Sequence, residues 1–230
     1  MQRISVFFSY LSGMVINLSQ KHSLISNWVS ELRNVDIQAD RQRFRRNLER
    51  LGEVIAYEIS KELPYKIIEV QTPLGINAAK VLAEQPVLAT ILRAGLPLHQ
   101  GLLNYFDNAD NGFIGAYRKH HRDGSFDISL EYISCPSLEN RILIISDPML
   151  ATGASLIKTL AAMKNEGVPS QIHIVCAIAC TVGIEYVLRE IGSKVKIWCG
   201  DIDDELTAKG YIVPGLGDAG DLAYGSKIQS

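Results

Sequence analysis

Short apolar runs alternate with amphipathic stretches along most of the chain. Between the runs, apolar residues recur every three or four positions, as they do on the buried face of a helix. The runs themselves are VLATIL (87–92), FIGAY (113–117), RILIIS (141–146), IHIVCAIA (172–179) and VKIWC (195–199). Runs of this kind separated by helices are typical of a parallel β-sheet buried on both faces. We therefore predict an α/β fold in which helices flank a parallel β-sheet, with ligands bound at the carboxyl ends of the strands.

A longer amphipathic stretch precedes these runs and extends from Asp40 to Leu63. Charged residues separate its apolar positions, which are Phe44, Leu48, Leu51, Ile55 and Ile59. This spacing predicts one long helix with a single buried face. Arginines gather near its start, at positions 41, 43, 45 and 46, but acidic residues follow soon after them. We interpret the cluster as a solvated surface rather than a binding patch.

Two segments break the alternation. Residues 118–137 carry a turn signal, Asp123-Gly124, between polar and alternating segments, which predicts a β-hairpin arm or flap. Residues 200–227 read GDIDDELTAKGYIVPGLGDAGDLAYGSK, which is rich in glycine and has no regular period. A long irregular segment in a compact domain is usually functional or disordered. The aromatic and apolar residues of this one indicate that it folds.

Composition adds limits on partners and location. The chain has 230 residues, and 23 basic against 25 acidic side chains give a net charge of −2. This balance provides no general attraction to nucleic acid or to a membrane surface, and we expect neither as a partner. The four cysteines (135, 176, 180 and 199) lack CxxC spacing. They are typical of buried structural thiols in the reducing cytoplasm, where we expect the protein to reside.

The first 13 residues, MQRISVFFSYLSG, contain one brief apolar run. The run is too short to span a bilayer, and no good cleavage site of a secretory signal follows it. Met14 could begin a chain of its own. We therefore treat residues 1–13 as an N-terminal extension without an assigned role, and residues 14–230 as a single domain.

The most informative motif is SDPMLATGAS (146–155), between an apolar run and a helical pattern. Asp147 follows the predicted strand directly, and the turn then leads into a helix whose first N–H groups have no internal partner. Such a helix start attracts an anion. Gly153 permits a close backbone approach, and Thr152 and Ser155 add hydroxyl groups. We interpret this turn as a phosphate cradle.

Other interpretations of this turn are weaker. A plain helix start capped by Thr152 or Ser155 explains the hydroxyl groups, but not the acid at the strand end. A Walker A loop does not fit, because Lys158 comes too late for the GxxxxGK[ST] spacing. Two arginines support an anion site: Arg93 follows the run 87–92, and Arg118 follows the run 113–117. Both should lie at the ligand-binding edge of the sheet, where guanidinium groups favour a second phosphate.

Together, these segments resemble a known family. ILRAGLPLHQGLL, AYR, SDPMLATGAS and IDDELTAKGYIVPGLGDAGDLAYG are similar, in order and separation, to the signature segments of the uracil phosphoribosyltransferases. The resemblance covers most of the chain from about Met14. It implies the type I phosphoribosyltransferase fold, with a core at about 64–199, a flexible arm at 118–137 and a uracil-binding hood at 200–230. The implied reaction, in pyrimidine salvage, transfers ribose 5-phosphate from phosphoribosyl diphosphate (PRPP) to N1 of uracil, giving UMP and pyrophosphate.

The resemblance also assigns roles to residues. The implied catalytic residues are Asp147, Arg118 and Asp218. The positions implied to bind PRPP are Arg93, Arg118, Asp147, Pro148, Met149, Leu150, Ala151, Thr152, Gly153, Ala154, Ser155 and Asp218. The positions implied to contact uracil are Ile212, Gly217, Asp218 and Ala219. The family implies Mg²⁺ carried in by PRPP rather than bound directly by the protein. It further implies a homodimer or larger homo-oligomer with the arm near the subunit contact, and GTP activation is a property of parts of the family.

Some positions depart from the family pattern, and two other functions stay open. Ala154 stands where the family usually has a second glycine, which is tolerable if the backbone there is helical. One alternative is a phosphoribosyltransferase for another base, such as a purine, although GYIVPGLGDAGD favours uracil. The other is a catalytically weak regulator that senses pyrimidine nucleotides or binds RNA on the same fold. The balanced charge argues against an RNA-binding protein.

Overall fold

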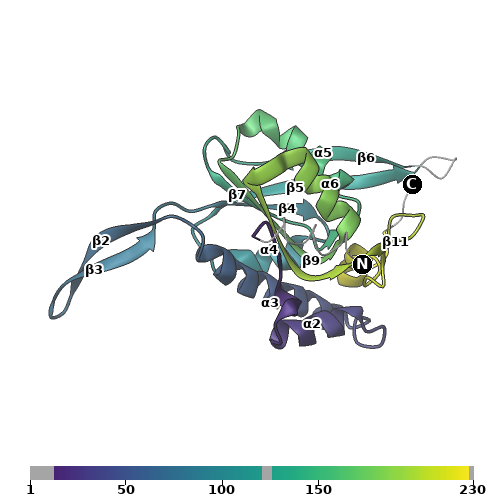
Figure 1. The fold of residues 1–230 in the computed structure, drawn as a ribbon, viewed down its shortest axis with the longest axis horizontal. Helices are drawn as coiled ribbons and strands as arrows, with labels where there is room; N and C mark the ends of the chain where they lie inside the picture. Colours follow the sequence, from purple (N-terminus) through teal and green to yellow (C-terminus); the bar gives the residue numbers. More distant parts are fainter. Residues whose placement is uncertain (1–12, 121–125, 228–230) are drawn as a thin grey trace.

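The computed structural model describes residues 13–120 and 126–227, and for residues 116–120 and 126–130 it describes the backbone alone. Within this part of the chain, eight strands form one sheet with seven of them in the order β1-β10-β9-β7-β4-β5-β6 (Figure 1). Their bounds are β1 Val15–Asn17, β4 Val87–Leu92, β5 Asp110–His120, β6 Phe126–Ser134, β7 Ile142–Ser146, β9 Gln171–Cys180 and β10 Val195–Asp203, while β8 (Met149–Leu150) pairs with β9. All neighbours are parallel except β5 and β6.

Helices cover both faces of this sheet (Figure 1). One face packs against α2 (Leu24–Arg33), α3 (Arg41–Ser60), α4 (Leu96–Leu103) and α7 (Ala219–Tyr224), and the other against α5 (Ala154–Met163) and α6 (Thr181–Ile191). Short 3-10 turns are η1 (Leu18–Gln20), η2 (Lys164–Glu166) and η3 (Gly192–Lys194). The strand β7 shows why the apolar runs are continuous. Ile144 faces the first helical layer and Ile145 the second, so neither side of the strand meets water.

The predicted fold class is confirmed, with a parallel sheet flanked by helices. Each predicted apolar run lies in a strand, although FIGAY is only the middle of the longer β5. The long helix predicted between Asp40 and Leu63 is α3, with Asp40 as its N-cap. It crosses α4 closely, because a Cβ atom on Gly101 would lie 2.0 Å from the carbonyl oxygen of Glu49.

The two irregular segments differ in how they join the body. The arm predicted at 118–137 begins inside β5 and returns as β6, so its strands extend the edge of the main sheet. Its Asp123-Gly124 turn lies outside the described residues, as do residues 1–12 of the predicted N-terminal extension. The glycine-rich tail is folded: β11 (Glu205–Leu206) pairs with β12 (Ile212–Val213), and α7 follows.

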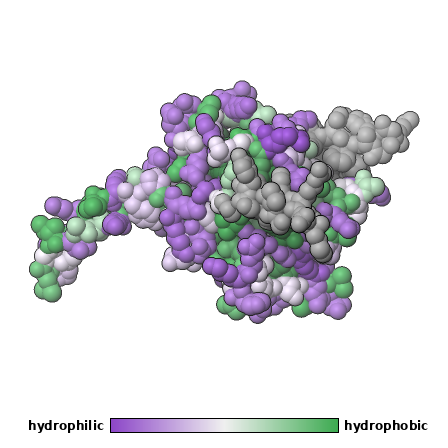
Figure 2. Space-filling model, viewed as in Figure 1, coloured by the Kyte–Doolittle hydropathy of each residue, from purple (hydrophilic) through white to green (hydrophobic). Residues whose placement is uncertain are grey.

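A second hairpin was not expected from the sequence. Strands β2 (Tyr65–Thr72) and β3 (Gly75–Leu82) pair with each other alone and project far from the body (Figure 1). Apolar side chains are exposed on the hairpin, as the green surface of this projection shows (Figure 2). None of the helices described is long and apolar enough to cross a membrane.

Candidate active site

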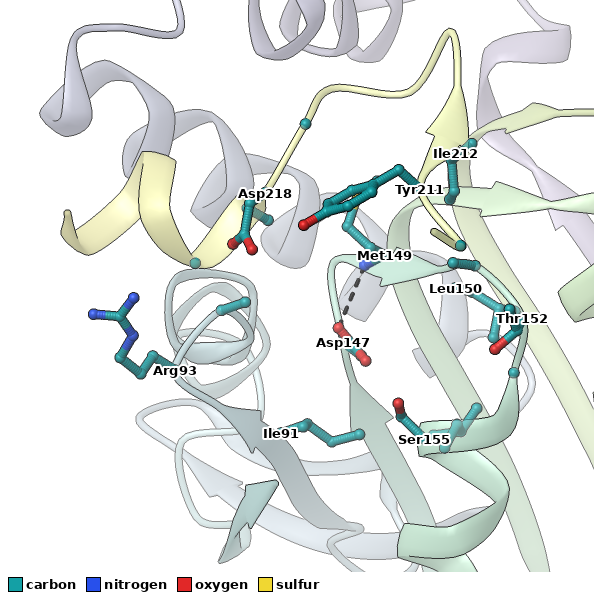
Figure 3. Close-up of a pocket in the computed structure, with 18 of the residues that line it drawn as sticks. Ile91, Arg93, Asp147, Met149, Leu150, Thr152, Ser155, Tyr211, Ile212 and Asp218 are labelled. Atoms are coloured by element: carbon teal, nitrogen blue, oxygen red, sulfur yellow. Dashed lines mark hydrogen bonds between the residues drawn. The ribbon is translucent and has the colours of Figure 1, made fainter. Parts of the chain in front are cut away.

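A pocket opens where the carboxyl ends of β4 and β7 meet the C-terminal tail (Figure 3). Its lining comes from three segments far apart in the sequence: residues 91–94 at the end of β4, residues 147–156 after β7, and residues 209–220 of the tail. This is the place where an open parallel sheet is expected to hold a ligand. Lys227, close to the end of the described chain, also lines it.

The segment after β7 has the geometry of an anion cradle. The strand ends at Ser146, and the carboxylate of Asp147 accepts a hydrogen bond from the Met149 N–H at 3.4 Å (Figure 3). Gly153 then adopts a left-handed conformation with φ 79°, which favours glycine, and α5 begins at Ala154. A helix start exposes N–H groups and the positive end of the helix dipole. These donors therefore lie at the pocket wall, beside the carboxylate of Asp147.

The alternative of a plain capped helix start is not what the structure has. Gly153 is the N-cap of α5, and it has no side chain to cap the helix. The Thr152 hydroxyl oxygen accepts a hydrogen bond at 3.3 Å from the N–H of Ala154, the first residue of α5, whereas an N-cap side chain binds the second or third helical N–H. Ser155 lines the pocket, and its hydroxyl points toward Asp147 (Figure 3). Ala154 lies in the helix, as its tolerance in the predicted cradle requires.

The start of α6 supports the cradle from behind. A Cβ atom on Gly183 would lie 2.2 Å from the carbonyl oxygen of Ala151, and one on Gly153 would lie 3.0 Å from the carbonyl oxygen of Gly183. The two backbones are therefore in direct contact, with no room for a side chain at position 183. This contact fixes the turn that carries the cradle.

The two predicted pyrophosphate-binding arginines differ in what the structure describes. The backbone of Arg118 lies in β5, and its side chain is outside the described part of the chain. Arg93 lines the pocket, but its guanidinium points away from Asp147 (Figure 3). It donates hydrogen bonds to the Asp221 carboxylate and to the carbonyl oxygen of Gly225, both at 3.0 Å. The guanidinium is thus held against α7 in this structure.

The tail supplies the opposite wall of the pocket. Ile212 is buried in β12. Gly217 has φ 93°, a backbone conformation that residues with a side chain rarely adopt. Asp218 is the N-cap of α7, where its Oδ1 accepts a hydrogen bond from the Asp221 N–H at 3.0 Å. Ala219 is buried behind it. The four positions implied to contact a base therefore line one wall, facing the cradle.

Some pocket residues were not predicted as site residues, namely Ile91, Leu92, Ala94, Leu156, Lys209, Gly210, Tyr211, Gly220 and Lys227. The Tyr211 ring lies across the pocket between Asp218 and Met149 (Figure 3). In the sequence, only its position next to Ile212 could have indicated that Tyr211 belongs to the site. Lys227 contributes positive charge, with its Nζ 3.8 Å from the Asp218 carboxylate. Among the described residues, no group of three histidine, cysteine or acidic side chains could hold a metal ion.

The cysteines do not contribute a nucleophile to this pocket. All four are free thiols, and none of them lines it. Cys176 lies in β9, the strand next to β7. Its pKa is raised well above the usual value by a hydrogen bond with Cys199 and by burial. It therefore stays protonated, which agrees with the structural role predicted for it.

Comparison with known proteins agrees with the geometry. Residues 19–226 match the family model described as uracil phosphoribosyltransferase. A uracil phosphoribosyltransferase of Porphyromonas gingivalis is 50% identical over 214 residues, which are 93% of this chain and 99% of the relative. One of Methanothermobacter thermautotrophicus is 39% identical over 184 residues, 79% of this chain and 83% of the relative. The solved structure of the AQ2163 protein from Aquifex aeolicus matches with TM-score 0.82 and 33% identity, covering 94% of this chain and all of that one.

Proposed function

Because the chain belongs to the uracil phosphoribosyltransferase family, we propose that it transfers ribose 5-phosphate from PRPP to N1 of uracil, giving UMP and pyrophosphate. The observation that carries the proposal is one shared pocket. The anion cradle at 151–155 and the tail positions Ile212 and 217–219 line it from opposite sides. A phosphoribosyl group on the cradle and a base under the tail would therefore face each other.

The chemistry asks for positioning and charge rather than a protein nucleophile. As the bond between ribose C1 and pyrophosphate breaks, the ribose gains positive charge and the departing oxygens gain negative charge; uracil N1 then bonds to C1 and loses its proton. We propose that the Asp147 carboxylate faces the ribose hydroxyls and the α5 N-terminus holds the 5-phosphate. Arg93 and Arg118 would offset the charge of the departing pyrophosphate. For this, Arg93 must exchange its Asp221 partner for the substrate.

Mg²⁺ and the arm complete this proposal. Two carboxylates line the pocket, those of Asp147 and Asp218, and they are compatible with a Mg²⁺ ion that PRPP carries in rather than one that the protein binds directly. We propose that Mg²⁺ arrives on PRPP, where it neutralises diphosphate charge. The arm at 118–137 would exclude water when both substrates are bound.

Base selection is proposed to come from the tail backbone. Uracil presents two carbonyl groups and an N3–H, and backbone groups near Gly217 can pair with them. Cytosine would place an amino donor where uracil has an acceptor, and a buried mismatch of that kind discriminates strongly. A purine-specific enzyme would instead prefer hypoxanthine to uracil.

The deciding experiment is a steady-state assay of the purified full chain with Mg²⁺, PRPP and one base at a time. Uracil, cytosine, hypoxanthine and orotate are compared, and UMP formation from uracil should exceed every other reaction. Preference for another base would overturn the proposed substrate. If no base gives product, the nucleotide-sensing regulator becomes the better interpretation, and UMP or RNA binding would then be measured directly.

Further parts of the proposal concern assembly and regulation. We propose a homo-oligomer, for which the exposed apolar hairpin β2–β3 is the structural support. GTP activation stays a prediction, which adding GTP to the same assay tests. The free thiols agree with the cytoplasmic location that we propose.

A further inference from the structure

An ion-pair cluster joins the end of α2 to the C-terminal tail, behind the pocket. Arg33, the last residue of α2, donates from Nη1 to Asp203 Oδ2 at 2.7 Å and from Nη2 to Asp203 Oδ1 at 2.9 Å. Its Nη2 also donates to Asp201 at 3.1 Å. Two parallel bonds between guanidinium and carboxylate fix both groups in one plane, which a lysine cannot reproduce.

Both Arg33 and Asp203 also hold the backbone of one tail residue, Gly215. The carbonyl oxygen of Gly215 accepts from Arg33 Nη1 at 2.9 Å, and the Gly215 N–H donates to Asp203 Oδ2 at 2.9 Å. At this position φ is +56°, and a Cβ atom would lie 2.2 Å from the Ile212 carbonyl oxygen. The turn folds back tightly on β12, and the ion pair holds its tip from outside.

This clamp is largely shielded from water. The side chains of Arg33 and Asp203 are only 19% and 7% exposed. Removing Arg33 would leave the Asp203 carboxylate without its counterion in a poorly solvated place, which is strongly unfavourable. The clamp is therefore a firm attachment rather than a passing surface contact.

Gly215 lies in the sequence between two residues of the pocket wall. Ile212 and Gly217 both line the pocket, whereas Arg33 and Asp203 do not. We infer that Arg33 and Asp203 are positioning residues that set the base-binding wall through Gly215. This inference rests on the proposed function, since it assigns the wall to uracil. The cradle is carried by β7, α5 and α6. The backbone of Asp203 touches α6, because its carbonyl oxygen accepts a hydrogen bond from Thr181 Oγ1 at 3.5 Å, but side-chain changes at Arg33 or Asp203 leave this bond in place. PRPP binding should therefore depend on the clamp less.

The test compares Arg33→Gln, Arg33→Lys and the matched control Arg43→Gln. Arg43, near the start of α3, pairs with Glu31 of α2 at 2.7 Å, and this ion pair joins two helices rather than a helix and the tail. We expect Arg33→Gln to raise the KM for uracil about tenfold while the PRPP Kd changes less than about threefold, and Arg33→Lys to recover part of the loss. Arg43→Gln should match the parent protein in both constants.

Asp203→Asn changes the other partner of the same clamp. If Arg33→Gln does not fold, Arg33→Lys and Asp203→Asn are measured instead, with the same expected selective rise in uracil KM. Arg33→Gln and Asp203→Asn should be non-additive when combined, because each breaks the same clamp. Equal changes in the uracil KM and the PRPP Kd would overturn the positioning role. A fall in melting temperature with both constants unchanged would overturn it as well. A parent protein that makes no UMP would instead refute the proposed function and leave the clamp to be tested by binding of uracil.

Discussion

At the scale of single residues, Asp147 is the side chain on which the proposed chemistry depends most. It lies at the carboxyl end of β7, between the cradle and the tail wall (Figure 3). Replacing it with asparagine preserves shape but removes the negative charge that would face the ribose. We predict that Asp147→Asn lowers kcat/KM by about 100-fold in the UMP assay, as for other groups that stabilise developing charge. A melting temperature close to the parent's is the control, and activity within about threefold of the parent would contradict this role.

His173 should make the stability of the protein depend on pH. Burial, assisted by the positive charge of Lys196, lowers the pKa of His173 to about 4. Its Nδ1 accepts a hydrogen bond from Trp198 Nε1 at 3.0 Å, so the neutral ring is part of the core. The unfolded chain binds a proton near pH 6.5, whereas the folded protein does not. Stability should therefore be fully present above pH 6.5 and fall as the pH approaches 4, by about 3 kcal/mol from this residue.

Chemical denaturation from pH 7.5 to 4.5 measures this effect. In His173→Asn, Oδ1 can take the place of Nδ1 toward Trp198, while the titrating group is gone. Its free energy of unfolding should depend less steeply on pH than that of the parent. Part of the slope should remain, because burial lowers the pKa of His99 as well. His22→Asn, at an exposed histidine, is the control and should keep the parent slope. An unchanged slope in His173→Asn would contradict the assignment.

At the scale of elements, the contact between α6 and the cradle turn makes a sharp prediction. A methyl group at position 183 cannot fit beside the Ala151 carbonyl oxygen without moving the turn. Gly183→Ala should therefore raise the KM for PRPP about tenfold and cost about 1–3 kcal/mol of stability.

The matched variant is Ala154→Gly, which restores the residue usual in the family at the first position of α5. It removes a methyl group where the backbone is already helical, so we expect activity within about twofold of the parent and a stability loss below about 1 kcal/mol. Steady-state kinetics and thermal unfolding of both variants check the pair. Equal PRPP constants in all three proteins would show that the turn is not held by α6, and a large effect of Ala154→Gly alone would mean that the cradle geometry is different.

Some elements of the fold could be predicted from the sequence and others could not. The buried strands were predictable because both faces meet helices, so that every residue from Ile142 to Ile145 is apolar. The cradle was predictable because its acid, glycine and hydroxyls are adjacent in the chain. By contrast, β2 and β3 are exposed on both faces and therefore carry no clear periodic signal. The Arg33–Asp203 pair spans 170 positions, and only the folded chain brings it together.

At the scale of the whole molecule, different parts of the fold hold the anion cradle and the tail wall, and the two meet at the pocket. Its carboxyl edge holds the cradle directly, whereas the tail reaches the same edge by packing across the first helical layer. Arg45 of α3 donates to the carbonyl oxygen of Ala223 at 2.7 Å, near the end of α7. Arg33 and Arg93 attach the tail at two further points. The arginines near the start of α3 are thus not all a solvated surface, because Arg45 supports the wall of the pocket.

The β2–β3 hairpin gives the last prediction, because it packs so little against the body. Ile67 and Ile76 are 69% and 68% exposed, and the strand register places both side chains on one face of the hairpin. Exposed apolar residues gathered on a projection are typical of a contact surface. We therefore predict that Ile67→Glu combined with Ile76→Glu dissociates the proposed homo-oligomer, as measured by sedimentation velocity at several concentrations. Buried glutamates would have to lose their hydration in the contact, which strongly disfavours association.

Tyr105→Glu is the control, since it places a glutamate on an exposed aromatic position of the body. It should leave the oligomer intact. If the hairpin variant associates as the parent does, the contact lies elsewhere, and the arm at 118–137 expected near the subunit contact becomes the surface to test. A parent protein that stays monomeric at all concentrations would contradict the oligomer itself. Assay of UMP formation on the separated species then tells whether one chain is sufficient for activity.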